Sequence, residues 1–294
     1  MHPSHKEAGM GGRWSNSMEL LKASWTVLRQ HSSLLAFPIV SALITIVMLA
    51  VLIIPAYFLT GASKGHVDNQ ALFYVFFFIF YFISSFVVIF FNTGLVACAQ
   101  ECLKGNDPGF GYGMGVAASH IGKIAGWAAI TATVGLVLKM IRERAGIFGA
   151  IVGSIIGIAW SLITFFVIPV LVFQDLGVIE SIKESAGIFR RTWGENMIAR
   201  FSLGLFFFLL GLIGLVPILL IIALHTPVFV VGMVAISIIY WTGLAILAMS
   251  LNGILSVALY DYAVTGQVPP PYNAQTIAHA FQPKPAKAGL FSNK

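Results

Sequence analysis

The residues of this chain that could carry chemistry are few and widely scattered. Its seven histidines show neither the spacing of metal ligands nor a nearby carboxylate pair; they stand at positions 2, 5, 31, 66, 120, 225 and 279. Cys98 and Cys102 are too few for a disulfide framework or a four-ligand zinc site, so we expect ordinary buried thiols. No phosphate-binding P-loop, GxSxG or HExxH motif occurs. The sequence therefore predicts a protein that is not an enzyme, with no catalytic residue, metal site or cofactor.

One charged cluster stands between two apolar runs and could act on anions. It consists of Lys139, Arg142, Glu143 and Arg144. Its cations are candidates for the mouth of a vestibule that attracts anions, or for a contact with lipid headgroups. The alternative is a solvated loop tip whose long side chains reach toward water. We favour the loop tip.

A stripe of small residues follows this cluster at every fourth position. Its members are Ala145, Gly149, Gly153, Gly157 and Ser161. Small residues at this spacing let another transmembrane helix approach closely, so these five are candidates for helix packing. Two partners are possible, the preceding apolar run or the same helix of a second subunit.

The elements that must position these residues are membrane-spanning helices. Apolar residues make up 58% of the 294 residues, charged residues only 10%, and mean hydropathy is +0.91. Such a chain reads as an all-α, multi-pass protein of the cell membrane. The net charge of +6 comes from Lys and Arg that lie between apolar runs, which does not fit nucleic-acid binding. Anionic lipid headgroups are the expected counter-charge.

Six apolar runs are long enough to cross a bilayer at about 20 residues per crossing. They cover residues 33–60, 71–96, 121–140, 145–173, 198–224 and 227–257. Four prolines, at positions 38, 55, 169 and 217, lie in or beside these runs and predict kinks. We expect a six-span membrane domain over residues 17–266, a flexible N-terminal tail over 1–16 and a cytoplasmic tail over 267–294.

A sequence unit occurs twice, at a constant offset of 161 residues. This offset relates Glu19 to Glu180, Lys22 to Lys183, Ser24 to Ser185, Arg29 to Arg190, Gly105 to Gly266 and Pro108 to Pro269. The copies cover residues 18–108 and 179–269. The hairpin between them, residues 109–178, could be a third, degenerate copy, but no residue-level match shows it.

Each copy begins with an amphipathic segment, residues 18–30 and 179–191. At 100° per residue, Glu19, Lys22 and Arg29 share a polar stripe, whereas Leu21, Trp25 and Leu28 face away from it. We expect both helices to lie on the membrane surface before their hairpins. The candidate membrane-surface residues are Lys22, Trp25, Arg29, Lys183, Arg190, Arg191 and Trp193.

The orientation follows from the distribution of Lys and Arg. With the N-terminus inside and six crossings, 13 of these residues lie on the inner side and 4 on the outer side. This predicts that both termini are cytoplasmic. Both copies then enter the bilayer from the same side, so the duplication is parallel, unlike the inverted repeats of many secondary transporters.

Three stretches carry a resemblance to known families. They are Ser24-Trp25 with Leu28-Arg29, the run from Pro169 to Ser185, and the run from Ala258 to Gly266. They resemble a prokaryotic family of six-span integral membrane proteins of unknown function, and more distantly the membrane domain attached to some glycerophosphodiester phosphodiesterases. This chain has no soluble phosphodiesterase domain, so the resemblance does not imply that activity.

Three functional hypotheses remain open from the sequence. The leading one is a self-associating scaffold or membrane-organising protein, with a second copy of the chain as a candidate partner. The second is a channel or transporter whose path runs by the middle hairpin, and the third is a membrane subunit of a lipid-active enzyme.

Overall fold

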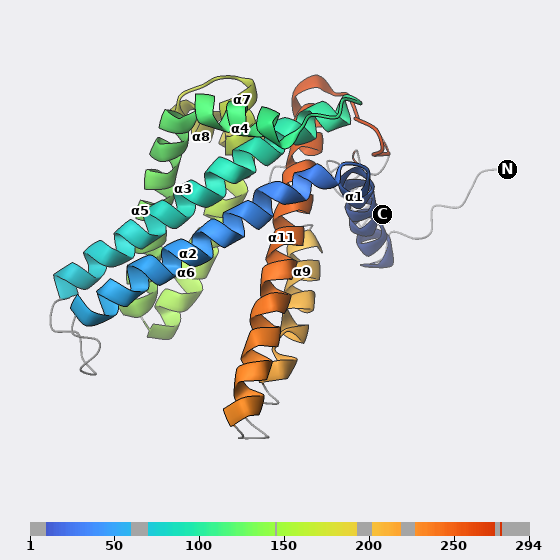
Figure 1. The fold of residues 1–294 in the computed structure, drawn as a ribbon. Helices are drawn as coiled ribbons and strands as arrows, with labels where there is room; N and C mark the ends of the chain where they lie inside the picture. Colours follow the sequence, from blue (N-terminus) through green and yellow to red (C-terminus); the bar gives the residue numbers. More distant parts are fainter. Residues whose placement is uncertain are drawn as a thin grey trace, which may run out of the picture.

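The computed structural model describes residues 10–59, 70–144, 146–192, 202–218, 227–273 and 277. Within these ranges every regular element is a helix and no strand occurs (Figure 1). Five helical segments of this part of the chain are long and apolar enough to cross a bilayer. The chain is therefore an all-α, multi-pass membrane protein.

The first unit contains α1 (Met10–Gln30), the 3-10 turn η1 (Ser32–Leu35), α2 (Ala36–Leu59) and α3 (Gln70–Leu103). Helix α1 begins well before the expected residue 18, so part of the expected N-terminal tail is helical. Pro38 lies in the first turn of α2, where its missing N–H leaves no bond unmade, so no kink follows. Helix α3 continues seven residues beyond the expected end of its span, from Val96 to Leu103.

The middle unit contains α4 (Phe110–Ser119), α5 (Ile121–Arg144), α6 (Gly146–Ile163) and α7 (Val167–Phe173). The run expected as one span over 145–173 is thus divided by a turn at residues 164–166. Pro169 explains the division, because it has no N–H to give to the carbonyl of residue 165 and its ring crowds that carbonyl. Here the expected kink is confirmed.

The last unit contains α8 (Val178–Thr192), α9 (Ser202–Ile213) and α11 (Pro227–Thr265). A turn at Gly214 and Leu215 separates α9 from residues 216–218, next to Pro217. The fifth expected span, 198–224, is described only over 202–218, and its apolar helix there, Phe206–Ile218, is shorter than a full crossing.

The first helix of each unit (α1, α4 and α8) shows how the three units fit together. Each packs on the hairpin that precedes it along the chain: α4 packs on α3, and α8 packs on α7 and α6. Helix α1 has no preceding hairpin and packs on α11 and α9, the last one. The units therefore form a closed ring, in which the middle hairpin occupies the place of a third unit.

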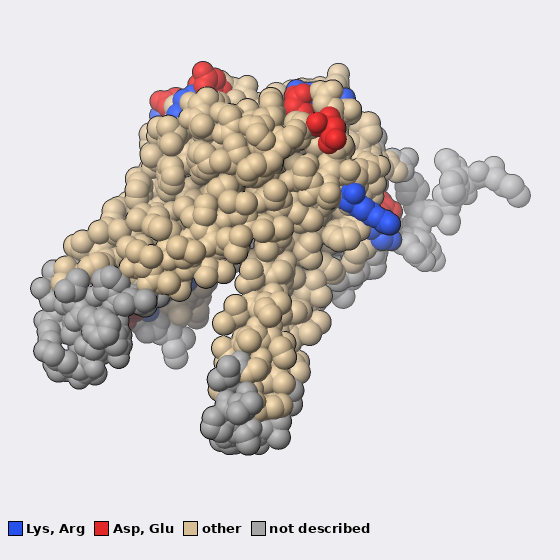
Figure 2. Space-filling view, viewed as in Figure 1, with Lys and Arg blue, Asp and Glu red and all other residues tan. Residues whose placement is uncertain are grey.

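The ring is tight at one end and open at the other. We call the tight end the head; it contains α1, α4, α7, α8 and the C-terminal parts of α3 and α11 (Figure 1). From it, α2, α3, α5 and α6 descend as one leg, while α9 and α11 descend as a second. Figure 2 shows an open notch between the two legs, and it shows charged atoms gathered at the head above a broad surface without them. Such a surface suits contact with acyl chains.

Two residues related by the 161-residue offset meet in the packing of the two long helices. Gln100 of α3 donates from Nε2 to both carboxylate oxygens of Asp261 in α11, at 3.1 and 3.3 Å, and these residues are 161 positions apart. Equivalent residues of repeated units meet only near the axis that relates the units. A left-handed residue also follows each of the helices α3, α7 and α11, with φ 89° at Gly105, 52° at Asp175 and 73° at Gly266. Helices α3, α7 and α11 all end at the head (Figure 1).

Candidate functional site

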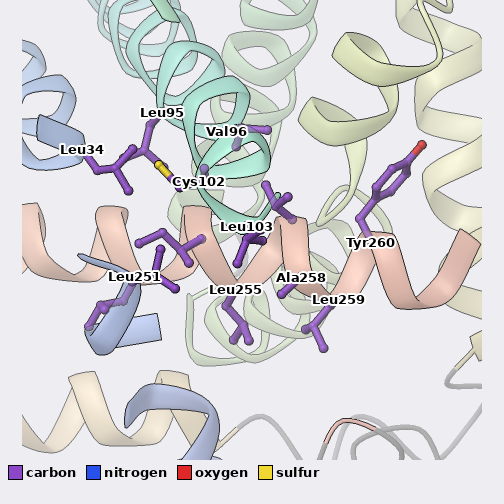
Figure 3. Packing of buried hydrophobic residues seen from close by; sticks show 14 of the residues in the cluster. Leu34, Leu95, Val96, Cys102, Leu103, Leu251, Leu255, Ala258, Leu259 and Tyr260 are labelled. Atoms are coloured by element: carbon purple, nitrogen blue, oxygen red, sulfur yellow. The ribbon is translucent and has the colours of Figure 1, made fainter. Parts of the chain in front are cut away.

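The centre of the head is a closed hydrophobic core. Figure 3 shows side chains of α3, among them Leu95 and Leu103, meeting those of α11, among them Leu255 and Ala258. Leu95 and Ala258 are fully buried. Cys98 and Cys102 are free and buried in the same cluster. Helices α3, α7 and α11 contact one another there.

The two amphipathic helices bury the same positions of the repeat. In α1 these are Leu20, Ser24 and Val27, and in α8 they are Ser181, Ser185 and Ile188, all buried. The apolar faces of both helices therefore pack against protein, where we expected the membrane surface. They are seated on the ring, on α11 and α9 for α1 and on α7 and α6 for α8.

The membrane-surface candidates lie on the opposite faces of these helices. Lys183, Arg190 and Arg191 are exposed on α8, where Arg191 donates to Glu184 at 2.7 Å. In α1, Lys22 and Arg29 are exposed, and Trp25 is 48% exposed between them. The expectation that Trp25 turns away from these cations is therefore wrong, because the buried face is centred on Ser24. Trp193 lies outside the described residues.

Two histidines find carboxylates that the sequence did not pair with them. His31 Nδ1 lies 2.8 Å from Asp107 Oδ1, and His120 Nε2 lies 3.6 Å from Asp175 Oδ1. Each histidine stands at the start of a hairpin and each aspartate follows its end, so both pairs close a hairpin at the head. Lys123 joins the second pair by donating to Asp175 Oδ1 at 2.6 Å. This bond holds the pKa of the exposed Asp175 carboxyl below its usual value.

The charged cluster and the small-residue stripe, treated separately in the sequence, meet in the middle hairpin. Gly149 and Gly153 are buried, and the side chain of Arg142 from α5 lies over Gly153 and Gly157 of α6. Its Nη2 donates to the carbonyl of Gly153 at 3.5 Å. The stripe therefore faces the preceding span, one of its two expected partners. Ser161 is exposed, and Ala145 lies outside the described residues.

Lys139 and Glu143 form an ion pair near Arg142. Their Nζ and Oε1 atoms lie 2.8 Å apart, and Lys139 Nζ also stands 4.1 Å from the centroid of the Phe77 ring of α3. Helix α5 continues to Arg144, whose side chain is outside the description. Lys139, Arg142 and Arg144 thus lie in the last turns of a helix, next to the hairpin tip, and Arg142 and Glu143 are exposed there.

The head and the middle hairpin offer apolar packing and ion pairs. In the described part of the chain, no group of three His, Cys, Asp or Glu residues could hold a metal ion. What the sequence missed is the direction of Arg142. The sequence does contain a signal for this direction. Helical side chains lean toward the N-terminus of their helix, and the N-terminus of α5 lies at the head.

Comparisons with known proteins give a family and no function. No curated protein matches the chain, and no solved structure does. One family model, described as a family of unknown function (DUF6159), matches residues 71–269. This match begins at α3, includes the middle unit and ends just beyond α11. It covers more than half of the chain, so the protein belongs to the DUF6159 family of unknown function.

Proposed function

We propose that this protein is a non-enzymatic scaffold or membrane-organising protein that acts through its shape in the bilayer. The observation that carries the proposal is the closure of the ring, in which α1 packs on the last hairpin while the two legs diverge below the head. One end of the molecule is thus a single packed body, and the other end admits lipid between its parts.

The apolar packing of the head argues against a channel along the axis. A conducting path needs polar groups or water where ions cross, and here Leu95, Ile254 and Ala258 fill the centre with no exposed surface. Two pairs of polar side chains bond at this level: Gln100 with Asp261, and Gln174 with the hydroxyl of Tyr260 at 3.0 Å. These pairs support a structural role for the head.

Lipids are the partners that this proposal requires. The legs present large apolar side chains to their surroundings, for example Ile239, which is 72% exposed on α11. Lys22 and Arg29 on α1 and Lys183 and Arg190 on α8 are exposed at the head, where they suit anionic headgroups. Self-association is the second part of the proposal, as the means by which one such body would organise a larger area.

The test is reconstitution of the full chain in liposomes and in nanodiscs. We expect no protein-dependent ion leak at any applied potential, together with a particle mass above that of one chain plus its lipid. A selective ion current would contradict the scaffold. A strictly monomeric particle would remove self-association.

A channel or transporter is the second candidate, and the direction of Arg142, along α6 toward the head, favours it. A path beside the middle hairpin would pass anions in preference to cations, and Arg142→Gln would reduce that preference. The third candidate, a membrane subunit of a lipid-active enzyme, is supported only by the resemblance to the membrane domain of some phosphodiesterases. Copurification of a phosphodiesterase with the tagged chain would favour it.

The orientation that we propose has both termini in the cytoplasm of the cell. Its support is the placement of 13 of the 17 Lys and Arg residues on one side. In a background without Cys98 and Cys102, an impermeant maleimide should label Ser63→Cys in intact cells and leave Thr265→Cys unlabelled. Labelling of Thr265→Cys alone would reverse the orientation.

A further inference from the structure

Helix α1 is seated on the far end of its own chain. It packs on α11 and α9, and no comparable packing joins its described residues to α2 or α3, the hairpin that follows it along the chain. The Oγ of its buried Ser24 lies 2.7 Å from the hydroxyl of Tyr272, 248 positions away. Helices α4 and α8, by contrast, follow along the chain from the hairpins that hold them. Of the three joints in the ring, the seat of α1 is therefore the one without a link along the chain.

The link between α1 and η1 is one residue long. Helix α1 ends at Gln30, and η1 begins at Ser32. His31 between them has φ −121° and ψ 69°, outside the helical region. Leu34 of η1 is fully buried in the core of the head, so η1 is fixed to the first hairpin. A change of the backbone angles at His31 would therefore move α1 as one body and leave η1 in place.

The face that α1 buries can drive association, whereas the surfaces of the legs cannot do so equally. Leu21, Val27 and Leu28 are buried on the seat, while Lys22 and Arg29 on the opposite face are exposed and place the helix near water. Covering such an apolar face there removes water from it, which is favourable. Apolar side chains on the legs contact acyl chains instead, so pairing them with another helix removes no water. The seat of α1 is therefore the stronger surface for self-association.

We propose that two copies of this chain associate by exchanging α1, so that α1 of one copy occupies the seat on α11 and α9 of the other. This inference rests on the self-association proposed above and names its surface. The partner fits because it is the same helix, and exchange reproduces every contact of the seat, including the bond from Ser24 to Tyr272 of the partner subunit. Copies in one bilayer share an orientation and a depth, which raises the effective concentration of α1 at the neighbouring seat.

Locking α1 onto its own chain tests the exchange. The full chain, with Cys98→Ala and Cys102→Ala and a fluorescent C-terminal tag, carries Ser24→Cys and Tyr272→Cys. It is treated with a short bis-maleimide in dilute detergent solution, and the chains that are joined internally are purified. Single-molecule photobleaching then counts the chains per particle in liposomes. We expect two or more chains for the untreated protein and one chain for the locked protein, because a locked α1 cannot reach a second seat.

A lock at another corner of the head is the matched control. His120 Nε2 and Asp175 Oδ1 lie 3.6 Å apart, so the same reagent on His120→Cys/Asp175→Cys joins the ends of the middle hairpin and leaves α1 free. This locked chain should assemble like the untreated protein. A second measurement uses two differently tagged chains that are expressed together, one with Ser24→Cys and the other with Tyr272→Cys. We expect the reagent to join the two chains to each other.

The outcomes separate the exchange from self-association in general. If chains locked between positions 24 and 272 assemble like untreated chains, the exchange is overturned and self-association through another surface stands. If the parent is strictly monomeric in liposomes, self-association fails and the exchange fails with it. The exchange is also overturned if the parent assembles but no product joins the two co-expressed chains.

Discussion

Helices α1 and α8 are copies of one sequence unit that are seated on different surfaces. Both bury the serine at the centre of the repeat, Ser24 in α1 and Ser185 in α8. Ser24 Oγ bonds to the hydroxyl of Tyr272, which follows α11, at 2.7 Å. Ser185 Oγ donates to the Ile163 carbonyl at 2.6 Å and accepts from the Phe166 N–H at 3.1 Å.

The difference shows that the two segments bury the same position against different partners. In the middle unit, Pro169 breaks the inner helix and frees backbone groups, and Ser185 satisfies two of them. Helix α11 is unbroken, so no backbone group is freed there. Ser24 instead bonds to Tyr272 in the segment that follows α11. A serine suits both places because its hydroxyl both donates and accepts.

The largest effect is expected where the serine satisfies backbone. Ser185→Ala removes the hydrogen bonds to the Ile163 carbonyl and from the Phe166 N–H, at about 1–3 kcal/mol each, so roughly 2–6 kcal/mol of stability should be lost. Ser24→Ala leaves only the buried Tyr272 hydroxyl unpaired and should cost about 1–3 kcal/mol. Thermal unfolding in detergent measures both.

Ser181→Ala is the matched control for this pair. Ser181 Oγ donates to the Gly177 carbonyl, which also accepts the Ser181 N–H at 2.8 Å, so its loss leaves no group unpaired. Equal losses for Ser24→Ala and Ser185→Ala would remove the distinction between the two seats.

The next effect tests whether α4 is seated as a third member of the ring. A Cβ atom on Gly113 would lie 2.5 Å from the carbonyl oxygen of Gly94 in α3 and 2.5 Å from Phe37 Cζ, so Gly113→Ala forces α4 away. Overpacking of this kind costs about 1–3 kcal/mol. Gly115→Ala, with nothing within 4 Å of its Cβ position, should leave the Tm unchanged or raise it. Similar melting of the two variants would place α4 off the ring.

The smallest effect concerns the closure of the middle hairpin at the head. The Lys123 bond lowers the pKa of Asp175, so this carboxylate favours the folded state above its unfolded pKa, and the contribution is lost as pH falls through its folded pKa. Asp175→Asn keeps a residue suited to positive φ. It should lower the Tm slightly at neutral pH and not at pH 2–3. A deficit that is the same at both pH values would contradict the ion pair.

Much of this fold could be predicted from the sequence because it depends on local properties. The apolar runs predict which segments enter the membrane, since no water is available there to bond exposed backbone. Pro169 predicts the break before α7, and the 161-residue offset predicts that α1 and α8 bury equivalent faces. These features depend on composition, spacing and a missing N–H within a few residues of one another.

The sequence alone determined the helices and their membrane location, whereas the tertiary structure decided what each helix packs against. The seat of α1 on the last hairpin and the pairing of His31 with Asp107, 76 residues away, have no local signal, because both arise only when the ring closes. The contact of Arg142 with Gly153 and Gly157 joins two features that the sequence showed apart. Their meeting depends on how α5 and α6 pack, which periodicity within either helix does not contain.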